Sequence, residues 1–173
     1  MKRALFLDRD GTLIIDKVYL SDPAGVEPIP GTAEALQRLR SLGYLLFLFT
    51  NQSGIGRGYH SIEDTHRVNE RMAEVLGVRF DGICIAPEAP GQPSRYRKPS
   101  PAFIEETIAS RALEPEGCTM VGDSAADIGA GLAAGIATVA VRTGKVDPIT
   151  LPEVASGRVP AYASFAAFAQ TLA

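Results

Sequence analysis

The stretch that decides the fold is Ala4-Leu5-Phe6-Leu7-Asp8-Arg9-Asp10-Gly11-Thr12, near the start of the chain. An apolar run of strand length, Ala4 to Leu7, leads directly into two carboxylates and a glycine. In an open parallel sheet, ligands bind beyond the carboxyl ends of the strands. The stretch therefore predicts both a strand and a candidate site at the end of that strand.

Outward from this stretch, apolar runs of strand length alternate with segments of helical periodicity. The expected strands are 4–7, 44–49, 80–86, 118–121 and 137–141. The expected helices are 32–42, 61–76, 124–134 and one that begins at Ser100-Pro101, while 142–160 should be irregular and 162–172 should form a strand edge and a helix. This alternation, with right-handed crossovers, predicts an α/β fold built on a doubly wound parallel sheet.

Three of the expected helix starts carry capping signals. Thr32 stands at the first of them, and Ser61 with Asp64 three residues on has the pattern of a capping box. Ser100 before Pro101 has the pattern of a cap followed by proline at the first helical position. We expect these side chains to satisfy free N–H groups at the helix starts.

Length and composition narrow the class of protein. The 173 residues correspond to one domain covering 1–173, long enough to bury roughly 70% of the surface that its unfolded chain exposes. A hydrophobic fraction of 46% with 21% charged residues is that of an ordinary globular protein. The formal charge of −3 offers no broad electrostatic footprint for nucleic acid or an anionic membrane. We therefore expect a small substrate and neither nucleic acid nor membrane as a partner.

The spacing of the cysteines and the length of the apolar runs indicate the cellular compartment. Cys84 and Cys118 fit neither a disulfide framework nor a zinc-ligand spacing, so both are expected to be buried thiols. The apolar run Ala4 to Leu7 is shorter than a secretory signal needs, and no stretch approaches the ~20 apolar residues of a membrane helix. We expect a cytoplasmic protein and, as to oligomeric state, a monomer.

Polar residues follow each of the first four expected strands. They are Asp8 and Asp10, Thr50 and Asn51, Arg97 and Lys98, and Asp123 with Asp127. The chain between successive groups is long enough, or nearly so, for a strand-helix-strand unit of ~30 residues. We therefore expect these side chains to meet at one edge of the sheet.

This set resembles the haloacid dehalogenase (HAD) superfamily of phosphohydrolases. The superfamily has four motifs: an acidic pair after the first strand, a Ser or Thr after the second, a Lys, and an acidic motif after the fourth. All four occur in order between Asp8 and Asp127. The resemblance implies a Rossmann-like three-layer core, dependence on Mg²⁺ and an aspartyl-phosphate intermediate.

The crowding of carboxylates itself points to a metal ion. Asp8, Asp10, Asp123 and Asp127 at one sheet edge would repel one another unless a cation is present or some of them are protonated. Mg²⁺ prefers oxygen ligands and bridges to substrate phosphate. We expect it to bind the carboxylates of Asp8 and Asp123 and the main-chain carbonyl of Asp10.

The two carboxylates of the first motif are expected to share the chemistry. An exposed Asp8, with a reference pKa of ~3.9, would be ionised at neutral pH and is the expected nucleophile. Asp10 is then the general acid that protonates the leaving oxygen and later deprotonates the hydrolytic water. This assignment makes the reaction a phosphoryl transfer to a carboxylate.

Other residues are expected to neutralise the charge on the transferred group. Lys98, the Thr50 hydroxyl and main-chain amides near Asp10 and Asn51 can do so. Asp127, one helical turn beyond Asp123, is expected to orient Lys98 from behind. The alternative for Asp127 is a purely structural role at a helix N-terminus.

A narrower resemblance comes from the glycine-rich stretch after Thr50-Asn51. Gln52 to Gly58, taken with 8–14 and 97–99, resembles the branch that contains D-glycero-D-manno-heptose 1,7-bisphosphate phosphatases and histidinol-phosphate phosphatases. The resemblance extends to about residue 141. Members of that branch lack a cap domain, and here 13–30 and 87–97 are too short to form one.

One departure from that branch lies in the loop before Arg97. The branch typically carries Cys and His zinc ligands there, whereas this chain reads Ala86-Pro87-Glu88-Ala89-Pro90-Gly91-Gln92-Pro93-Ser94-Arg95-Tyr96. We therefore expect no structural zinc and a loop stiffened by proline. Arg57 and Arg97 are expected to contact a second phosphate or sugar oxygens through their forked donors.

The sequence leaves three functions open. The first is a Mg²⁺-dependent phosphatase of small phosphorylated substrates, a sugar bisphosphate above all, with histidinol phosphate as the closest rival. The second is a signalling receiver module, but its phosphoacceptor follows the third strand, where this chain has Ala86-Pro87. The third is a phosphate-binding module without turnover.

Overall fold

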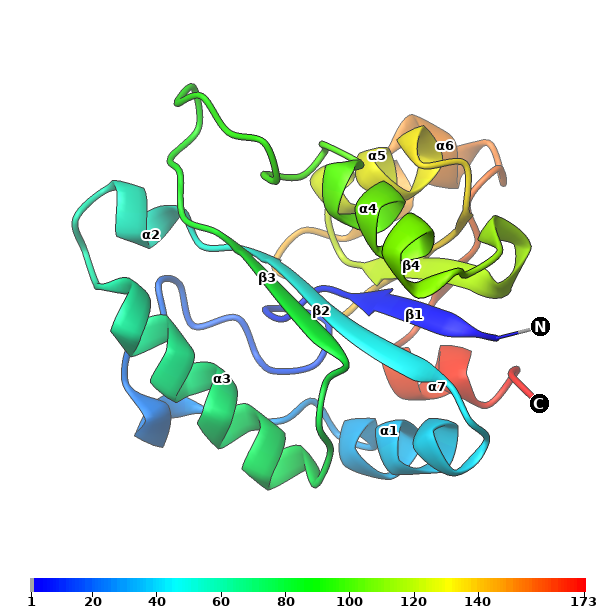
Figure 1. Ribbon diagram of the computed structural model, residues 1–173, viewed down its shortest axis with the longest axis horizontal. Helices are drawn as coiled ribbons and strands as arrows, with labels where there is room; N and C mark the ends of the chain where they lie inside the picture. Colours follow the sequence, from blue (N-terminus) through cyan, green and yellow to red (C-terminus); the bar gives the residue numbers. More distant parts are fainter. Residues whose placement is uncertain (1) are drawn as a thin grey trace.

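The computed structural model describes residues 2–173 and is built around a six-stranded parallel sheet (Figure 1). The strands are β1 (Ala4–Leu7), β2 (Leu45–Asn51), β3 (Gly82–Ala86), β4 (Cys118–Gly122), β5 (Ala137–Val141) and β6 (Ala161–Tyr162). Their order across the sheet is β3-β2-β1-β4-β5-β6. The predicted doubly wound α/β fold is confirmed, including the short last strand.

Helices cover both faces of this sheet. They are α1 (Thr32–Ser41), α2 (Ser53–Gly56), α3 (Ile62–Leu76), α4 (Ala102–Arg111), α5 (Ala125–Ala133), α6 (Pro152–Ala155) and α7 (Phe165–Ala169). Figure 1 shows α1, α3 and α7 on the lower side and α4, α5 and α6 on the upper side. Leu5 and Leu7 of β1 face the first group, while Ala4 and Phe6 face α4 and α5, as the alternation of side chains along a strand requires. The result is a three-layer sandwich.

The point where the strand order reverses lies beside β1. Its neighbours are β2 and β4, and Leu7 pairs with Leu48 on one side and with Val121 on the other. In parallel sheets this arrangement opens a crevice at the carboxyl ends of the strands. The residues that follow β1 and β4 are therefore brought side by side.

The capping predictions had mixed outcomes. Ser61 and Asp64 form the predicted capping box at the start of α3. Thr32 was wrong as a cap, because α1 is preceded by Gly31 in the left-handed region. Ser100 lies one residue before the N-cap position Pro101, and its hydroxyl accepts the predicted hydrogen bond from the main-chain N–H of Ala102, the first residue of α4, at 3.3 Å. Thr32 lies within the first turn of α1, where its side chain is fully buried.

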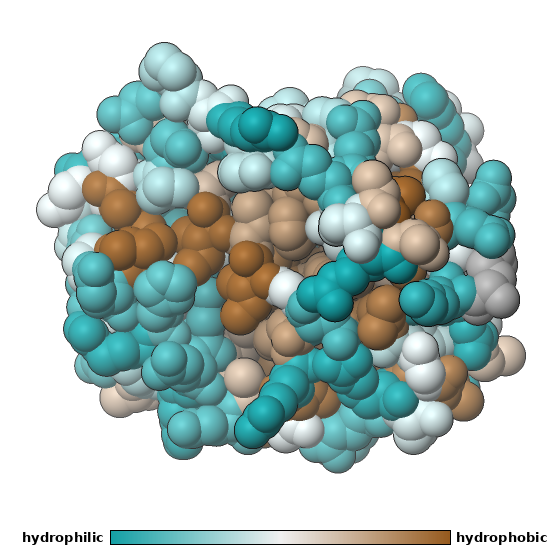
Figure 2. Space-filling model, viewed as in Figure 1, coloured by the Kyte–Doolittle hydropathy of each residue, from teal (hydrophilic) through white to brown (hydrophobic). Residues whose placement is uncertain are grey.

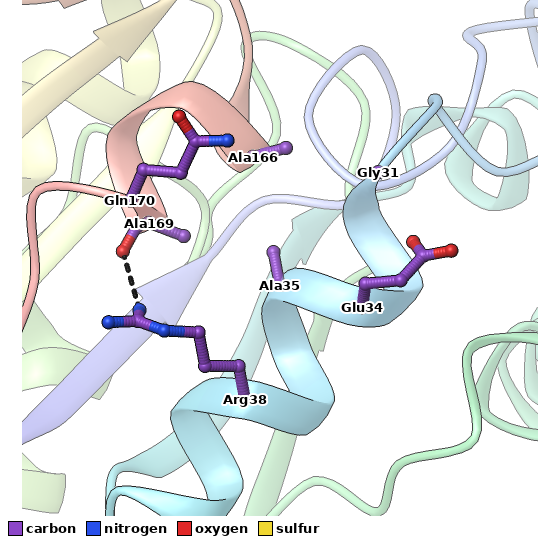
Figure 3. A pocket seen from close by; sticks show the side chains of 7 residues that line it. All are labelled: Gly31, Glu34, Ala35, Arg38, Ala166, Ala169 and Gln170. Atoms are coloured by element: carbon purple, nitrogen blue, oxygen red, sulfur yellow. Dashed lines mark hydrogen bonds between the residues drawn. The ribbon is translucent and has the colours of Figure 1, made fainter.

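The C-terminal helix packs against α1. Figure 3 shows the shallow apolar cleft between them, in which Ala35 faces Ala166 and Ala169. Arg38 reaches across from α1 and donates hydrogen bonds to the carbonyl oxygens of Ala169 at 3.0 Å and Leu172 at 2.7 Å. The last residues of the chain are thereby fixed to the layer below the sheet.

β3 forms one edge of the sheet, and β6 forms the other. In Figure 2, apolar surface extends from the left side to the centre of the molecule, over the region where α2 and β3 lie in Figure 1. Ile83 of β3 is 49% exposed. Within the described residues, 13–30 and 87–97 form no separate folded unit, since their regular structure is limited to a short 3₁₀ turn at Pro23–Gly25 and isolated β-bridges at Ile14 and Pro28. The loops alone therefore border the carboxyl ends of the strands. Across residues 2–173, no helix has the length and apolarity that crossing a membrane requires.

Candidate active site

Three carboxylates meet beyond the carboxyl ends of β1 and β4. Asp8 follows β1 directly, and its main-chain N–H donates to the carbonyl of Val121 at 3.0 Å, which continues the sheet by one residue. Asp123 follows β4, and Asp127 lies in the first turn of α5. One carboxylate oxygen from each of Asp8, Asp123 and Asp127 lies within 4.8 Å of the other two. The predicted convergence of these residues is observed.

Lys98 provides the positive charge at this point. Its Nζ donates to Asp8 Oδ1 at 2.7 Å, to Asp127 Oδ1 at 2.6 Å and to the carbonyl oxygen of Phe49 at 2.6 Å. The residue is 3% exposed, so its ammonium group is screened little by solvent. All three donors of the ammonium group are used, which fixes its position relative to Asp8.

Asp127 both caps α5 and binds Lys98. Its Oδ2 accepts hydrogen bonds from the main-chain N–H of Ser124 at 3.0 Å and from the Ser124 hydroxyl at 2.5 Å, which completes a capping box at α5. Its Oδ1 is the oxygen that binds Lys98. The two roles considered for Asp127 are therefore compatible, because each uses a different oxygen.

Burial changes the ionisation of the carboxylates. Asp8 is only 8% exposed, so the prediction of an exposed Asp8 was wrong; burial raises its pKa to about 7, although Lys98 acts against that shift. Burial, followed by the nearby charges of Asp8 and Asp127, raises the pKa of Asp123 to about 8. Burial acts to lower the pKa of Lys98, but Asp127 and Asp8 outweigh it and raise that pKa above its ordinary value. Without a further cation, the protein resists ionising Asp8 and Asp123 together.

The site fits a hard divalent cation. The donors are carboxylate oxygens, which Mg²⁺ prefers, and a divalent charge would remove the cost of ionising Asp8 and Asp123 in close proximity. The carboxylate of Asp10 is not part of this group. Its Oδ2 binds Arg9 and Gln52 instead, so the predicted contribution of Asp10 through its main-chain carbonyl stays a prediction.

Thr50 and Asn51 end β2 on the other side of β1. The fully buried Thr50 hydroxyl accepts a hydrogen bond from Gln52 Nε2 at 2.7 Å. Asn51 binds the main chain of Lys98 with both ends of its amide: Oδ1 accepts from the N–H at 2.9 Å and Nδ2 donates to the carbonyl at 3.1 Å. Asn51 therefore fixes the backbone from which the Lys98 side chain extends.

The two candidate substrate arginines lie on different loops. Arg57 is exposed just after α2. Arg97 is partly buried, and its Nη1 donates to the carbonyl of Glu88 at 2.9 Å. The Ser94 hydroxyl donates to Glu88 Oε2 at 2.8 Å, so hydrogen bonds hold the loop, where only proline stiffness was expected. Neither arginine contacts the carboxylate cluster directly.

A buried polar network behind Asp10 was not predicted. It links Arg9 from the turn after β1, Gln52 from the position directly after β2, and Asn69 from the middle of α3. Arg9 offered a signal in the sequence, because a cation between two carboxylates of a strand-end turn is unusual. Asn69 offered none, since it occupies one position in an amphipathic helix. Asp10 is therefore bordered by this buried polar network, whereas Asp8, Asp123 and Asp127 form the separate carboxylate cluster.

The loop after β5 also belongs to the site, although its segment was expected only to be irregular. The Thr143 hydroxyl donates to the carbonyl of Gly11 at 2.6 Å. A Cβ atom at Gly144 would lie 1.8 Å from Asp123 Oδ2, so only glycine lets the backbone pass there. Lys145 Nζ lies 3.4 Å from Asp16 Oδ2. This loop therefore packs directly against the Asp123 carboxylate.

Comparisons with known proteins agree with this geometry. The Hydrolase_like family model, described as HAD-hydrolase-like, matches residues 95–165. A crystal structure of D,D-heptose 1,7-bisphosphate phosphatase from B. bronchiseptica, complexed with magnesium and phosphate, superposes with a TM-score of 0.86. The match covers 98% of this chain and 97% of that protein at 27% identity. The magnesium complex belongs to a protein of the same fold.

Two curated relatives are closer in sequence. One, from Pasteurella multocida, is 44% identical over 87% of this chain and 86% of the relative. The other, from Haemophilus ducreyi, is 41% identical over 83% of this chain and 85% of the relative. The chain belongs to the haloacid dehalogenase superfamily of hydrolases, and it is a phosphatase, not a receiver module. Both relatives bear the same more specific name, D-glycero-beta-D-manno-heptose-1,7-bisphosphate 7-phosphatase.

Proposed function

We propose that this phosphatase removes the 7-phosphate of D-glycero-D-manno-heptose 1,7-bisphosphate through an aspartyl-phosphate intermediate on Asp8. The observation that carries the proposal is the placement of Lys98 Nζ between the carboxylates of Asp8 and Asp127, beside Asp123. The names of the curated relatives support the choice of substrate.

The residues present fit Mg²⁺ as the cofactor. Asp8 and Asp123 would hold it with their carboxylates and Asp10 with its main-chain carbonyl, while Asp127 stays with Lys98 and Ser124. When bound, Mg²⁺ neutralises part of the charge on the transferring phosphoryl group. We propose no structural zinc, because 86–96 contains neither Cys nor His.

The chain's own residues account for the covalent steps. A carboxylate oxygen of Asp8 forms a bond to phosphorus while the bond from phosphorus to the sugar oxygen breaks. Asp10 gives its proton to that leaving oxygen and keeps the electron pair. Asp10 then takes a proton from the water that attacks the phosphorus of the intermediate, which frees inorganic phosphate and restores Asp8.

Lys98 and Thr50 stabilise the charge that moves during these steps. Lys98 Nζ contacts Asp8 Oδ1, so it lies next to the attacking group and would lie close to the oxygens of a phosphoryl group bound there. The Thr50 hydroxyl accepts from Gln52 and can donate its own proton to a phosphoryl oxygen. Main-chain N–H groups near Asp10 and Asn51 would complete the phosphate contacts.

The sugar and its second phosphate would occupy the hollow next to Asp10. That hollow is lined by Asp16, Tyr19, Asn51, Ser53 and Lys145, among others. Arg57 and Arg97 on the flanking loops would supply forked donors for the anomeric phosphate. The proposed selectivity thus comes from loops, since no cap domain covers the described residues.

A substrate panel tests the proposed function. The purified protein with Mg²⁺ would be offered heptose 1,7-bisphosphate as separate α and β anomers, histidinol phosphate, hexose bisphosphates and nucleotides. We expect the highest kcat/KM for the heptose bisphosphate, with phosphorus NMR showing loss of the 7-phosphate signal and retention of the anomeric one. A higher kcat/KM for histidinol phosphate or a nucleotide would overturn the substrate assignment and leave the phosphatase class standing.

We further propose that residues 1–173 act as one catalytic domain, as a monomer in the cytoplasm. Two buried, unpaired cysteines, Cys84 and Cys118, support a reducing compartment. Light scattering of the purified protein tests the monomer, because a mass well above 18.3 kDa would contradict it.

A further inference from the structure

Arg9 is a fully buried cation that the proposed chemistry does not use. Its side chain is inaccessible to solvent, and each of its donor groups has a partner. Nε donates to Asp10 Oδ2 at 2.9 Å, Nη1 to Asn69 Oδ1 at 3.0 Å and Nη2 to Gln52 Oε1 at 3.0 Å. Arginine is almost never buried to this degree unless it is paired, because its desolvation is costly. A buried charge of this kind needs a role that offsets its cost.

Arg9 and its partner Gln52 both bind the same oxygen of Asp10. That oxygen, Oδ2, also accepts a hydrogen bond from Gln52 Nε2 at 3.0 Å. The other oxygen, Oδ1, accepts no hydrogen bond from any residue in 2–173. The Asp10 side chain is 23% exposed and lines the hollow next to Asn51. The carboxylate is therefore held by one oxygen and presents the other to the hollow.

We propose that Arg9 is a positioning residue that acts through Asp10, and that it aims Asp10 Oδ1 at the oxygen of the leaving group. This inference rests on the proposed function, in which the proton on Oδ1 passes to the leaving oxygen as its bond to phosphorus breaks. The electron pair of the O–H bond stays on Oδ1, which later accepts a proton from the hydrolytic water. Arg9 itself exchanges no proton and contacts no substrate.

The shape of the guanidinium group suits this task. Its planar fork lets one side chain connect the turn after β1 to Gln52, directly after β2, and to Asn69 on α3. Rotation of the Asp10 carboxylate would break its bonds to both Arg9 and Gln52. A lysine at this position would keep the charge and lose the fixed directions, so charge and orientation can be separated by substitution.

Leaving-group dependence is the test. A sugar phosphate needs a proton at its leaving oxygen, whereas p-nitrophenyl phosphate releases a stable phenolate without one. For Arg9→Lys and Arg9→Met we expect kcat/KM for the sugar phosphate to fall about 10- to 100-fold, the scale of a misplaced catalytic group, and for the aryl phosphate less than about 3-fold. Equal falls for both substrates would overturn the inference and leave the proposed function intact.

Controls separate positioning from stability. Met72 lies on the same helix as Asn69 and is fully buried, so Met72→Ala would leave a cavity in the core. This variant should have a lower melting temperature and an unchanged ratio of the two kcat/KM values. In an Asp10→Asn background, Arg9→Met should cause no further loss, because Arg9 acts only through Asp10. A further loss there would contradict the inference.

A second variant covers the case in which the Arg9 variants do not fold. Asn69→Ala removes one anchor of Arg9 and leaves Asp10 untouched. It should shift the kcat/KM ratio in the same direction by a smaller factor, and an unchanged ratio would overturn the inference. Absence of turnover of either substrate by the wild-type protein would overturn the proposed function and this inference together, and it would be seen before any variant is made.

Discussion

Lys98 Nζ lies 2.7 Å from Asp8 Oδ1, although 90 positions separate the two residues in the chain. The loop that ends at Lys98 starts from the edge strand β3, whereas Asp8 directly follows the inner strand β1. Asp127 completes the arrangement from α5. The site is therefore assembled from three separate parts of the chain around one buried ammonium group.

Loss of this ammonium group should be costly for the fold as well as for activity. Lys98→Met would leave Asp8 and Asp127 buried without a cation, and breaking a buried pair in this way costs about 3–5 kcal/mol. For a chain of this length that corresponds to a melting temperature lower by roughly 6–20 °C. Thermal unfolding measures the change. The matched variant Lys145→Met, whose side chain is 47% exposed, should unfold close to the wild-type temperature; similar losses in both would contradict the assignment.

Replacing Asp8 should reduce turnover more than replacing Asp10. Asp8→Asn removes the proposed nucleophile and should abolish turnover, whereas Asp10→Asn should lower kcat by about 10²- to 10⁴-fold, the usual contribution of a general acid and base. Circular dichroism should show both variants folded. Asp22→Asn, at an exposed 3₁₀ turn, serves as the control with wild-type rates. Near-normal rates for Asp8→Asn would refute the mechanism.

Stability should fall with rising pH in the absence of Mg²⁺, and the stabilisation by Mg²⁺ should increase over the same range. Burial raises the pKa of Asp8 to about 7 and that of Asp123 to about 8, whereas both return to ordinary values near 3.8 in the unfolded chain. Between those limits the metal-free folded protein binds more protons than the unfolded chain, so these groups stabilise it less as pH rises from about 4 to about 8. Mg²⁺ competes with those protons, so its stabilising effect should grow over the same window.

Melting curves from pH 5 to 9, in EDTA and in Mg²⁺, check this dependence. Asp123→Asn is the matched control, because it removes one of the two titrating groups and a proposed Mg²⁺ ligand. In EDTA at pH 8 it should unfold at a higher temperature than the wild type, and Mg²⁺ should stabilise it less. A variant that unfolds earlier than the wild type in EDTA would show that Asp123 does not carry the expected cost.

The backbone of the loop after β5 should control metal affinity. Gly144→Ala would place a methyl group against Asp123 Oδ2, so either the carboxylate or the loop must move. We expect Mg²⁺ to bind about 10-fold or more weakly by calorimetry, in line with the effect of disturbing groups that orient a metal ligand. Gly131→Ala, where the added carbon would meet Thr138 and Met120 in the core, should cost stability and leave Mg²⁺ affinity unchanged. Equal affinities in the wild type and Gly144→Ala would contradict this role.

Arg97 should affect the choice of substrate more than the chemistry. Arg97→Ala is expected to raise KM for the bisphosphate about 10-fold, the value of a lost charged hydrogen bond of roughly 1.4 kcal/mol, with a smaller change for a monophosphate. Arg95→Ala is the matched control, since Arg95 is exposed on the same loop and pairs with Glu106. Unchanged bisphosphate turnover in Arg97→Ala would remove Arg97 from the proposed phosphate contacts.

The local pattern of the sequence predicted most of the sheet and the position of the site. Apolar runs bounded by turns defined β1 to β5 within a few residues. The placement of Asp8 and Asp123 at strand ends, and of Lys98 at the end of the loop after the third strand, implied their convergence. The short helix α2 was missed, because its glycines read as a loop and a single helical turn has no periodicity to detect.

Features that depend on packing could not be read from the sequence. The burial of Asp8 reverses the expected ionisation, and burial is a property of the neighbours that surround a residue. The roles of Asn69 on α3 and Thr143 after β5 arise from contacts with residues far away in the chain. A polar side chain in an amphipathic helix or an irregular loop is usually solvated, so nothing local distinguished these two.

The two hydrogen bonds between the Asn51 amide and the backbone of Lys98 have a consequence for how far the loop before Lys98 can change. Because Asn51, the last residue of β2, binds the backbone of Lys98, the position of Lys98 does not depend on the stretch 87–96 alone. We therefore expect that 87–96 can be replaced while the ammonium group of Lys98 stays in place. Grafts that rejoin the chain at Arg97 should accordingly yield chimaeras with altered selectivity and an unchanged catalytic apparatus.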